Sequence, residues 1–209
     1  MGRNRAGVRR PPFRVMLDET RIGRAPGAAR MVDVTGHLGM ALLWLAPAWF
    51  LLDHRKTAGT FVVTGVPFGM LPDIDLVLEG LVPTIKHHGV FHTVLAVTLL
   101  AAVIGPVVGK VVEPLAGNTD WLSPDAAAHS VRFGFLAVWV PGLAHVFADM
   151  LSAPDIADSI EPLWPLYHGS IGVDLVWYNN PVVNWGLLVA GVLVNVGLFL
   201  YVGGRPSST

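Results

Sequence analysis

The sequence predicts an all-α, multi-pass membrane protein, a transmembrane bundle of four to five helices. Two observations, composition and the length of the apolar stretches, lead to this prediction. The 209 residues are 53% hydrophobic and only 14% charged, whereas soluble domains carry about 25% charged residues. Several apolar stretches approach or exceed the roughly 20 residues that a helix needs to cross a bilayer core. Cysteine is absent, so neither disulfides nor thiolate metal ligands contribute to the fold.

The first 30 residues differ in composition from the remainder. Eight of the 14 lysines and arginines are arginines that precede Met31, which leaves 14 − 8 = 6 for the rest of the chain. This segment has no apolar run long enough for the core of a signal peptide. We expect residues 1–30 to form a basic, disordered tail, or to precede the true translation start at Met31. Binding of this tail to anionic lipid or nucleic acid is the alternative, and no specific nucleic-acid site is expected.

The remaining residues, 31–209, are expected to form one membrane-embedded domain. Its apolar stretches are residues 38–52, 61–71, 90–112, 131–151 and 182–202. The first two are short for a bilayer, and Pro67 interrupts the second, so they are either tilted short spans or half-buried helices. The last three are long enough to cross, and Pro141 predicts a kink in the fourth. We therefore expect a multi-pass protein of the cell membrane, with its orientation left open.

Two aspartates, Asp73 and Asp75, follow Pro72 in the segment LPDID at 71–75. Carboxylates two residues apart do not share a helix face. After a proline they suit a turn in which both converge on one cation. The alternative is a simple helix cap, because aspartate after proline is common where a helix begins.

Three histidines, His87, His88 and His92, fall within six residues at the start of the third apolar stretch. His88 and His92 are four residues apart and would share a helix face at the mouth of a membrane span, while Gly89 could keep His87 outside the helix. Neutral imidazoles at this spacing are natural zinc ligands. Interfacial histidines that face lipid headgroups are the alternative.

His145 and Asp149 lie four residues apart inside the fourth apolar stretch, so they share one helix face. Ionisable groups at this depth are costly, and they usually face the bundle interior and pair with another group. A hydrogen bond between successive helix turns would be the simplest pairing. His37 stands at the start of the first apolar stretch, where a histidine considered alone would most often be structural.

Taken together, these residues lie at an end of, or within, different apolar segments. Helices packed side by side could bring them to one pocket, with ligand atoms within about 5 Å of one another. Such a pocket would hold a divalent metal, zinc by the choice of ligands, and has enough ligands for two ions. The predicted metal ligands are His37, Asp73, Asp75, His87, His92, His145 and Asp149.

The order of these motifs resembles the membrane-bound metal-dependent hydrolase family, whose members are also described as LexA-binding, inner-membrane-associated hydrolases. The resemblance covers residues 31–166. It implies a multi-pass helical protein with a divalent metal site and hydrolase activity. It rests on His37, on LPDID at 71–75, on HHGVFHT at 87–93, on HVFAD at 145–149 and on PLWPL at 162–166.

One block of the family pattern, H-R-G-x-T-H-S, is altered in this chain. His87 and His92 align with its two histidines, whereas His88 stands where the family has arginine. Phe91 replaces its threonine and Thr93 its serine. The arginine would suit an anionic substrate group, so the resemblance assigns His88 to the substrate side of the site.

The predicted function is hydrolysis of an ester or phosphoester through a metal-activated water. The two residues expected to act in catalysis are Asp73, as a carboxylate at the site, and His88, which would hold the scissile oxygen as charge develops on it. A site that opens at the bilayer face would favour a lipid-linked substrate, and membrane lipid is the expected partner. The alternatives are an ion-coupled transporter and a membrane protein that a metal stabilises without catalysis.

Overall fold

The computed structural model describes residues 28–82, 84–152, 159–173 and 175–203. Within these ranges the regular structure is helical, and the only β-type pairing is an isolated bridge between Ser152 and Val176. Five helical segments there are long and apolar enough to cross a membrane. The predicted all-α transmembrane bundle is therefore confirmed, with five spans. Residues 1–27 of the predicted basic tail lie outside the part of the chain that the structure describes, and helix α1 begins at Ala28.

Short helical turns precede, follow or extend several of the spans. In chain order the helices are α1 (Ala28–Leu45), α2 (Ala48–Leu51), α3 (Arg55–Gly65), η1 (Val66–Met70), α4 (Ile74–Glu79), η2 (Val90–His92), α5 (Val94–Gly117), α6 (Pro124–Ala128), α7 (Ser130–Leu151) and α8 (Pro181–Gly203).

The first two spans are longer than their apolar stretches suggested. The first crosses as α1 followed by α2, and the second as α3, η1 and α4 in series. Pro67 does not end the second span, because it lies in the first turn of the 3₁₀ segment η1, where a missing backbone N–H breaks no helical hydrogen bond. Both segments are therefore spans rather than half-buried helices by length and composition.

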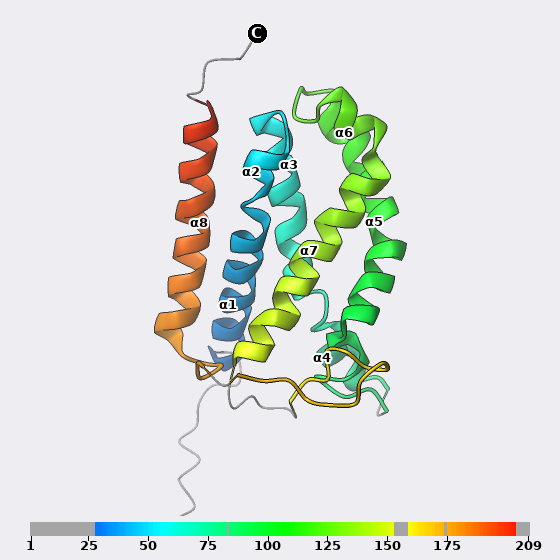
Figure 1. Cartoon of the computed structure of the whole chain (residues 1–209), viewed down its shortest axis with the longest axis vertical. Helices are drawn as coiled ribbons and strands as arrows, with labels where there is room; N and C mark the ends of the chain where they lie inside the picture. The colour runs from blue at the N-terminus through cyan, green and yellow to red at the C-terminus, as the bar shows by residue number, and fades with distance from the viewer. Residues whose placement is uncertain (1–27, 83, 153–158, 174, 204–209) are drawn as a thin grey trace, which may run out of the picture.

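Helices α5 and α7 form one closely packed pair, and α1 and α8 form another (Figure 1). Helix α1 also packs against α7, which joins the two pairs. Small residues allow the closest approach. A Cβ atom added at Gly134 of α7 would lie 2.0 Å from the carbonyl oxygen of Gly105 in α5. Membrane helices commonly associate through such small residues, because lipid offers no hydrophobic driving force between helices.

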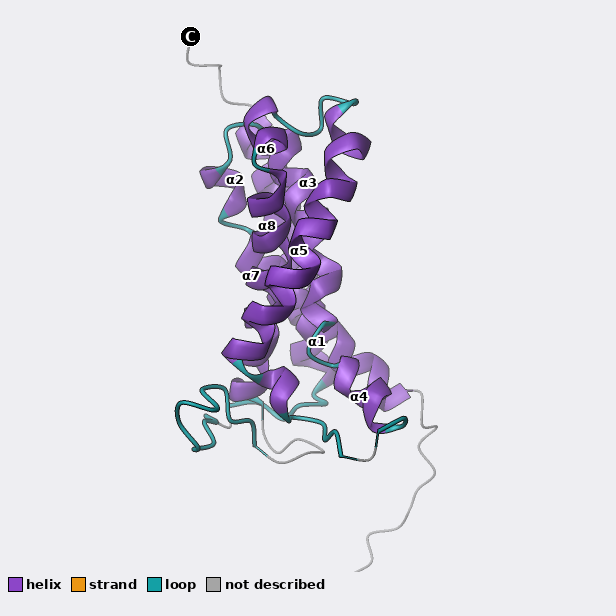
Figure 2. Cartoon of the chain, turned by 90° about the vertical axis from the view of Figure 1, so that its right-hand side faces the viewer, coloured by secondary structure: helices purple, strands orange, loops and turns teal. Residues whose placement is uncertain are grey.

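The two ends of the bundle differ (Figures 1 and 2). At one end, drawn lowest in both views, lie α4, the first turns of α1 and α8, the last turn of α7 and the loops around them. At the other end lie α2 and α6. An apolar cluster fills the bundle toward this second end, where Phe61 of α3 meets Phe133 of α7 edge to face. The predicted ligands all belong to the first end.

Candidate metal centre

The predicted ligands come from several parts of the bundle. His37 projects from α1, and both His145 and Asp149 from one face of α7. His92 ends the short turn η2 before α5. Asp73 occupies the position that precedes α4, yet its side chain makes no capping hydrogen bond. Its carboxylate is therefore not a simple helix cap and is available to the interior.

Four side-chain atoms from these elements converge, namely Asp73 Oδ1, His92 Nε2, His145 Nε2 and Asp149 Oδ2. His92 Nε2 lies 3.4 Å from each carboxylate oxygen. His145 Nε2 lies 3.3 Å from Asp73 Oδ1 and 3.2 Å from Asp149 Oδ2. The two imidazole nitrogens are 3.2 Å apart. Ligands about 2.0–2.1 Å from a tetrahedral ion lie about 3.3 Å from one another, so these spacings are those of a zinc-type ligand shell.

The far side of each ring determines where its proton lies. His145 Nδ1 is 2.6 Å from the carbonyl oxygen of Gly69. A carbonyl oxygen only accepts hydrogen bonds, so Nδ1 carries a proton and donates it, and in the neutral ring Nε2 then has a lone pair. His92 Nδ1 is 3.0 Å from Asp75 Oδ2, and although the contact lacks hydrogen-bond geometry, the carboxylate favours the proton on that nitrogen.

With Nδ1 as the one protonated nitrogen of each ring, the four converging atoms are all acceptors. Two imidazole lone pairs meet two carboxylate oxygens, and Asp149 Oδ2 is buried without a hydrogen-bond partner among the described residues. Acceptors buried together without a donor are costly. A divalent cation at their centre would bind all four atoms at once, so this set of ligand atoms fits a metal ion.

Further side chains hold this set in place. His37 Nε2 donates to Asp149 Oδ1 at 2.8 Å, and the His37 ring stacks on that of His145 with centroids 3.9 Å apart. His87 Nδ1 donates to Asp75 Oδ1 at 2.9 Å. Contacts of this kind orient ligands and raise their basicity at metal sites.

All seven predicted ligands belong to two groups whose ligand atoms lie within 4.8 Å of one another. One group consists of Asp73, Asp75, His87 and His92, and the other of His37, His145 and Asp149. The contacts of His92 and His145 with Asp73 join the two groups into one centre. The structure thus brings the predicted residues together in one place.

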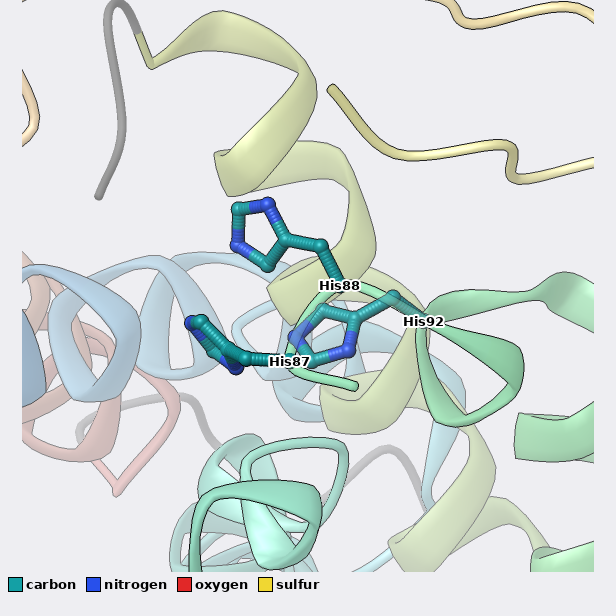
Figure 3. Close-up of side chains that lie close together, drawn as sticks. All are labelled: His87, His88 and His92. Carbon is teal, nitrogen blue, oxygen red and sulfur yellow. The ribbon is translucent and has the colours of Figure 1, made fainter. Parts of the chain in front are cut away.

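His88 lies beside the centre, where Figure 3 shows the rings of His87, His88 and His92 extending to the same side of one short loop. The centroid of the His88 ring is 4.3 Å from that of His87 and 4.8 Å from that of His92. The prediction that His88 and His92 share a helix face is wrong. His88 has a φ of 60°, which no α-helix contains. Helix α5 begins only after Thr93, whose hydroxyl accepts the hydrogen bond of Ala96 N.

Exposure is uneven around the centre. The rings of His92 and His145 are 0% exposed, whereas the side chains of Asp73 and His87 are 11% and 9% exposed. His88 as a residue is 9% exposed. The partly open edge of the centre is therefore formed by Asp73 and the two adjacent histidines.

Sequence reasoning missed the part played by Gly69. Its carbonyl oxygen orients His145, and a Cβ atom at this position would lie 2.8 Å from the Cβ atom of Ala41 in α1. Because the orienting atom belongs to the backbone, no pattern of side chains could have indicated it. A second backbone contact, from Val94 N to the carbonyl oxygen of Pro162 at 2.9 Å, ties the PLWPL segment to the start of α5 next to the centre.

Comparison with known proteins gives one match. The family described as YdjM inner membrane protein has a model that matches residues 31–208. Neither the curated proteins nor the solved structures contain a match. The matched range contains the five candidate spans and every residue of the centre.

Proposed function

The chain belongs to the YdjM inner membrane protein family, and from that premise we propose that it is a membrane-embedded, metal-dependent hydrolase of esters or phosphoesters. Family membership and the five candidate spans make it a multi-pass membrane protein. The buried histidines and aspartates could hold a metal ion. The proposal adds the identity of that ion, zinc, and the reaction.

One observation supports the proposal above all others. Two imidazole nitrogens and two carboxylate oxygens from three separate elements converge, each nitrogen lying 3.2–3.4 Å from the oxygens and 3.2 Å from the other nitrogen. With Nδ1 as the one protonated nitrogen of each ring, none of the four atoms is a donor. A structural hydrogen-bond network would pair donors with acceptors. Two imidazole nitrogens and two carboxylate oxygens are a common ligand set for zinc, and they are less suited to calcium or magnesium, which prefer oxygen alone.

The proposed ligands are Asp73, His92, His145 and Asp149. A catalytic ion also needs a position for water, which here would be a fifth ligand position at the open edge beside Asp73. The contacts of His145 with Gly69 and of His37 with Asp149 fix the directions of two of these ligands before any substrate binds. A bound divalent ion supplies Lewis acidity and lowers the pKa of a water molecule toward about 7. Asp73 is the most exposed of the four, so its second oxygen is placed to accept a proton from water that enters at the open edge.

His88 is proposed to contact the substrate. Its ring stands at the open edge beside His92, in the place that the family resemblance assigns to a substrate-side arginine. An imidazole N–H directed at the scissile oxygen would stabilise the negative charge that develops there. The centre lies at one end of the bundle, close to where the spans leave the membrane, so we propose that the substrate is lipid-linked.

The test is hydrolysis by detergent-purified protein of a panel of lipid and soluble esters and phosphoesters. Activity should be lost with a chelator and restored by zinc. Asp73→Asn should lose both bound zinc and activity. Glu79→Gln is the matched control, because Glu79 is an exposed carboxylate on the adjacent helix α4.

A second variant separates the ion from the substrate contact. His88→Gly removes the ring and suits the positive φ of this position. It should retain wild-type zinc content and lose activity by about 100-fold, the usual effect of removing one oxyanion donor. Zinc-loaded wild-type protein that hydrolyses none of the panel, together with unchanged zinc content in Asp73→Asn, would contradict the proposal.

A further inference from the structure

A second hollow lies at the opposite end of the bundle from the metal centre. It has a volume of about 620 Å³ and is lined by parts of α1, α2, α6 and α7. We propose that it binds one membrane phospholipid whose zwitterionic headgroup carries a primary amine. This inference does not depend on the proposed hydrolase function, because the cavity shares no residue with the centre.

The lining changes from polar to apolar along the bundle axis. Arg132 lies two residues after the start of α7, and further along the same helix the lining continues through Leu136 to Val140. The eight residue steps from Arg132 to Val140 cover about 12 Å of helix. Trp44 of α1 also lines the cavity. A charged mouth that leads into an apolar groove matches a phospholipid, whose headgroup would lie at the mouth and whose acyl chain would lie in the groove.

The mouth carries both signs of charge. Arg132 and Asp53 line it, and within the described parts of the chain neither makes an ion pair. Asp125 also lines the mouth, but His129 Nδ1 stands 3.4 Å from its carboxylate. One guanidinium and one carboxylate therefore remain for a ligand. A guanidinium binds phosphate with two parallel hydrogen bonds, and a carboxylate accepts from an ammonium group.

These charges select among phospholipid headgroups. All phospholipids offer a phosphate to Arg132. Phosphatidylethanolamine also offers a primary ammonium that can donate to Asp53, whereas the quaternary ammonium of phosphatidylcholine has no N–H to donate. Phosphatidylglycerol carries a net negative charge without a cation, and the carboxylates at the mouth oppose it. The cavity therefore favours the ethanolamine headgroup.

The experiment measures lipid binding to the full chain in detergent by native mass spectrometry. The three lipids are phosphatidylethanolamine, phosphatidylcholine and phosphatidylglycerol with identical acyl chains. Phosphatidylethanolamine should bind about tenfold more tightly than the other two, the usual effect of one charge-assisted hydrogen bond. Arg132→Gln should weaken binding of all three lipids. Asp53→Asn should remove the preference for phosphatidylethanolamine and leave the binding of phosphatidylcholine unchanged.

Matched controls use charges at the same end that lie outside the cavity. Lys110 pairs with Glu113 on α5, and Asp120 lies in the loop before α6, so Lys110→Gln and Asp120→Asn should bind lipids like the wild type. The proposal is overturned if phosphatidylglycerol binds as tightly as phosphatidylethanolamine. It is also overturned if Asp53→Asn retains the preference, or if Lys110→Gln weakens binding as much as Arg132→Gln.

Discussion

Asp75 is fully buried and faces two imidazole nitrogens, Nδ1 of His87 at 2.9 Å and Nδ1 of His92 at 3.0 Å. Its spacing from Asp73 predicted a ligand role for both aspartates. In the structure the two carboxylates lie on opposite edges of the His92 ring, with Asp73 near Nε2 and Asp75 near Nδ1. We infer that Asp75 orients His92 and does not itself bind the ion. This arrangement of carboxylate, histidine and metal is common at zinc sites.

Replacing Asp75 by asparagine tests this role. Asp75→Asn keeps the size of the side chain and removes its charge, so His92 should become a poorer ligand. Zinc affinity should fall about 10- to 100-fold, with zinc still bound at saturating concentration. Asp73→Asn, by contrast, should abolish zinc binding. Titration with zinc in a competitive chelator distinguishes the two variants, and equal losses of affinity would assign Asp75 to the ligand shell instead.

At the scale of elements, the packing of α5 against α7 positions the centre. Helix α7 carries His145 and Asp149, and the start of α5 follows directly after His92. The two helices meet through Gly105 and Gly109 on α5 and Gly134 on α7, where backbone contacts backbone. Side chains at these positions would separate the helices and with them the two histidines of the centre.

Gly134→Ala should therefore destabilise the protein. The new Cβ atom would lie 2.0 Å from the carbonyl oxygen of Gly105, and overpacking of this kind costs about 1–3 kcal/mol. Gly197→Ala on α8 is the matched control, because its Cβ atom would meet nothing within 4 Å and alanine is the better helix former. Thermal unfolding in detergent should show a lower melting temperature for the first variant only. Equal melting temperatures would contradict the packing argument.

At the scale of the whole molecule, the centre joins segments that are far apart in the sequence. His37 and Asp149 are hydrogen-bonded although they are 112 residues apart in the sequence. Asp73 contacts His92, just before α5, and His145, in α7. A bound ion would link the start of α4, the turn before α5 and α7, and the hydrogen bond between His37 and Asp149 would join α1 to them. Its binding free energy would therefore contribute to the stability of the whole bundle.

Chelation should lower the melting temperature of the wild-type protein. At free zinc about 100-fold above the dissociation constant, binding stabilises the folded state by about 2.7 kcal/mol. The shift should grow with zinc concentration and should disappear in Asp73→Asn. The measurement is thermal unfolding with and without chelator. A melting temperature that is independent of zinc in the wild type would contradict a metal link between the helices.

Much of the fold follows from the lengths of the apolar stretches alone. The third, fourth and fifth spans were predicted within a few residues, because their apolar stretches exceed the width of a bilayer core. The first two were predicted too short. Apolar length cannot show that a 3₁₀ segment at Val66–Met70 continues a span past Pro67, nor that α1 extends beyond the apolar stretch as far as Ala28.

The candidate site, like the fold, was predicted only in part. Residue types and spacing indicated the candidate residues, because buried histidines and aspartates on membrane helices require partners. They could not indicate the partner of each atom. The position of His88 outside any helix depends on a positive φ, and the orientation of His145 depends on a backbone carbonyl of η1.

By itself, the sequence determined that this protein is a multi-pass helical membrane protein with titratable residues in its apolar segments. Composition and the lengths of the apolar stretches are sufficient for that, because the bilayer imposes one length and one type of backbone hydrogen bonding. Only the tertiary structure decided that two imidazole nitrogens and two carboxylate oxygens converge, and that Arg132 and Asp53 line the same second cavity. Whether residues of different helices come together depends on the crossing angle and the rotation of the packed helices. Both are set by pairs of helices, so neither can be derived from one segment alone.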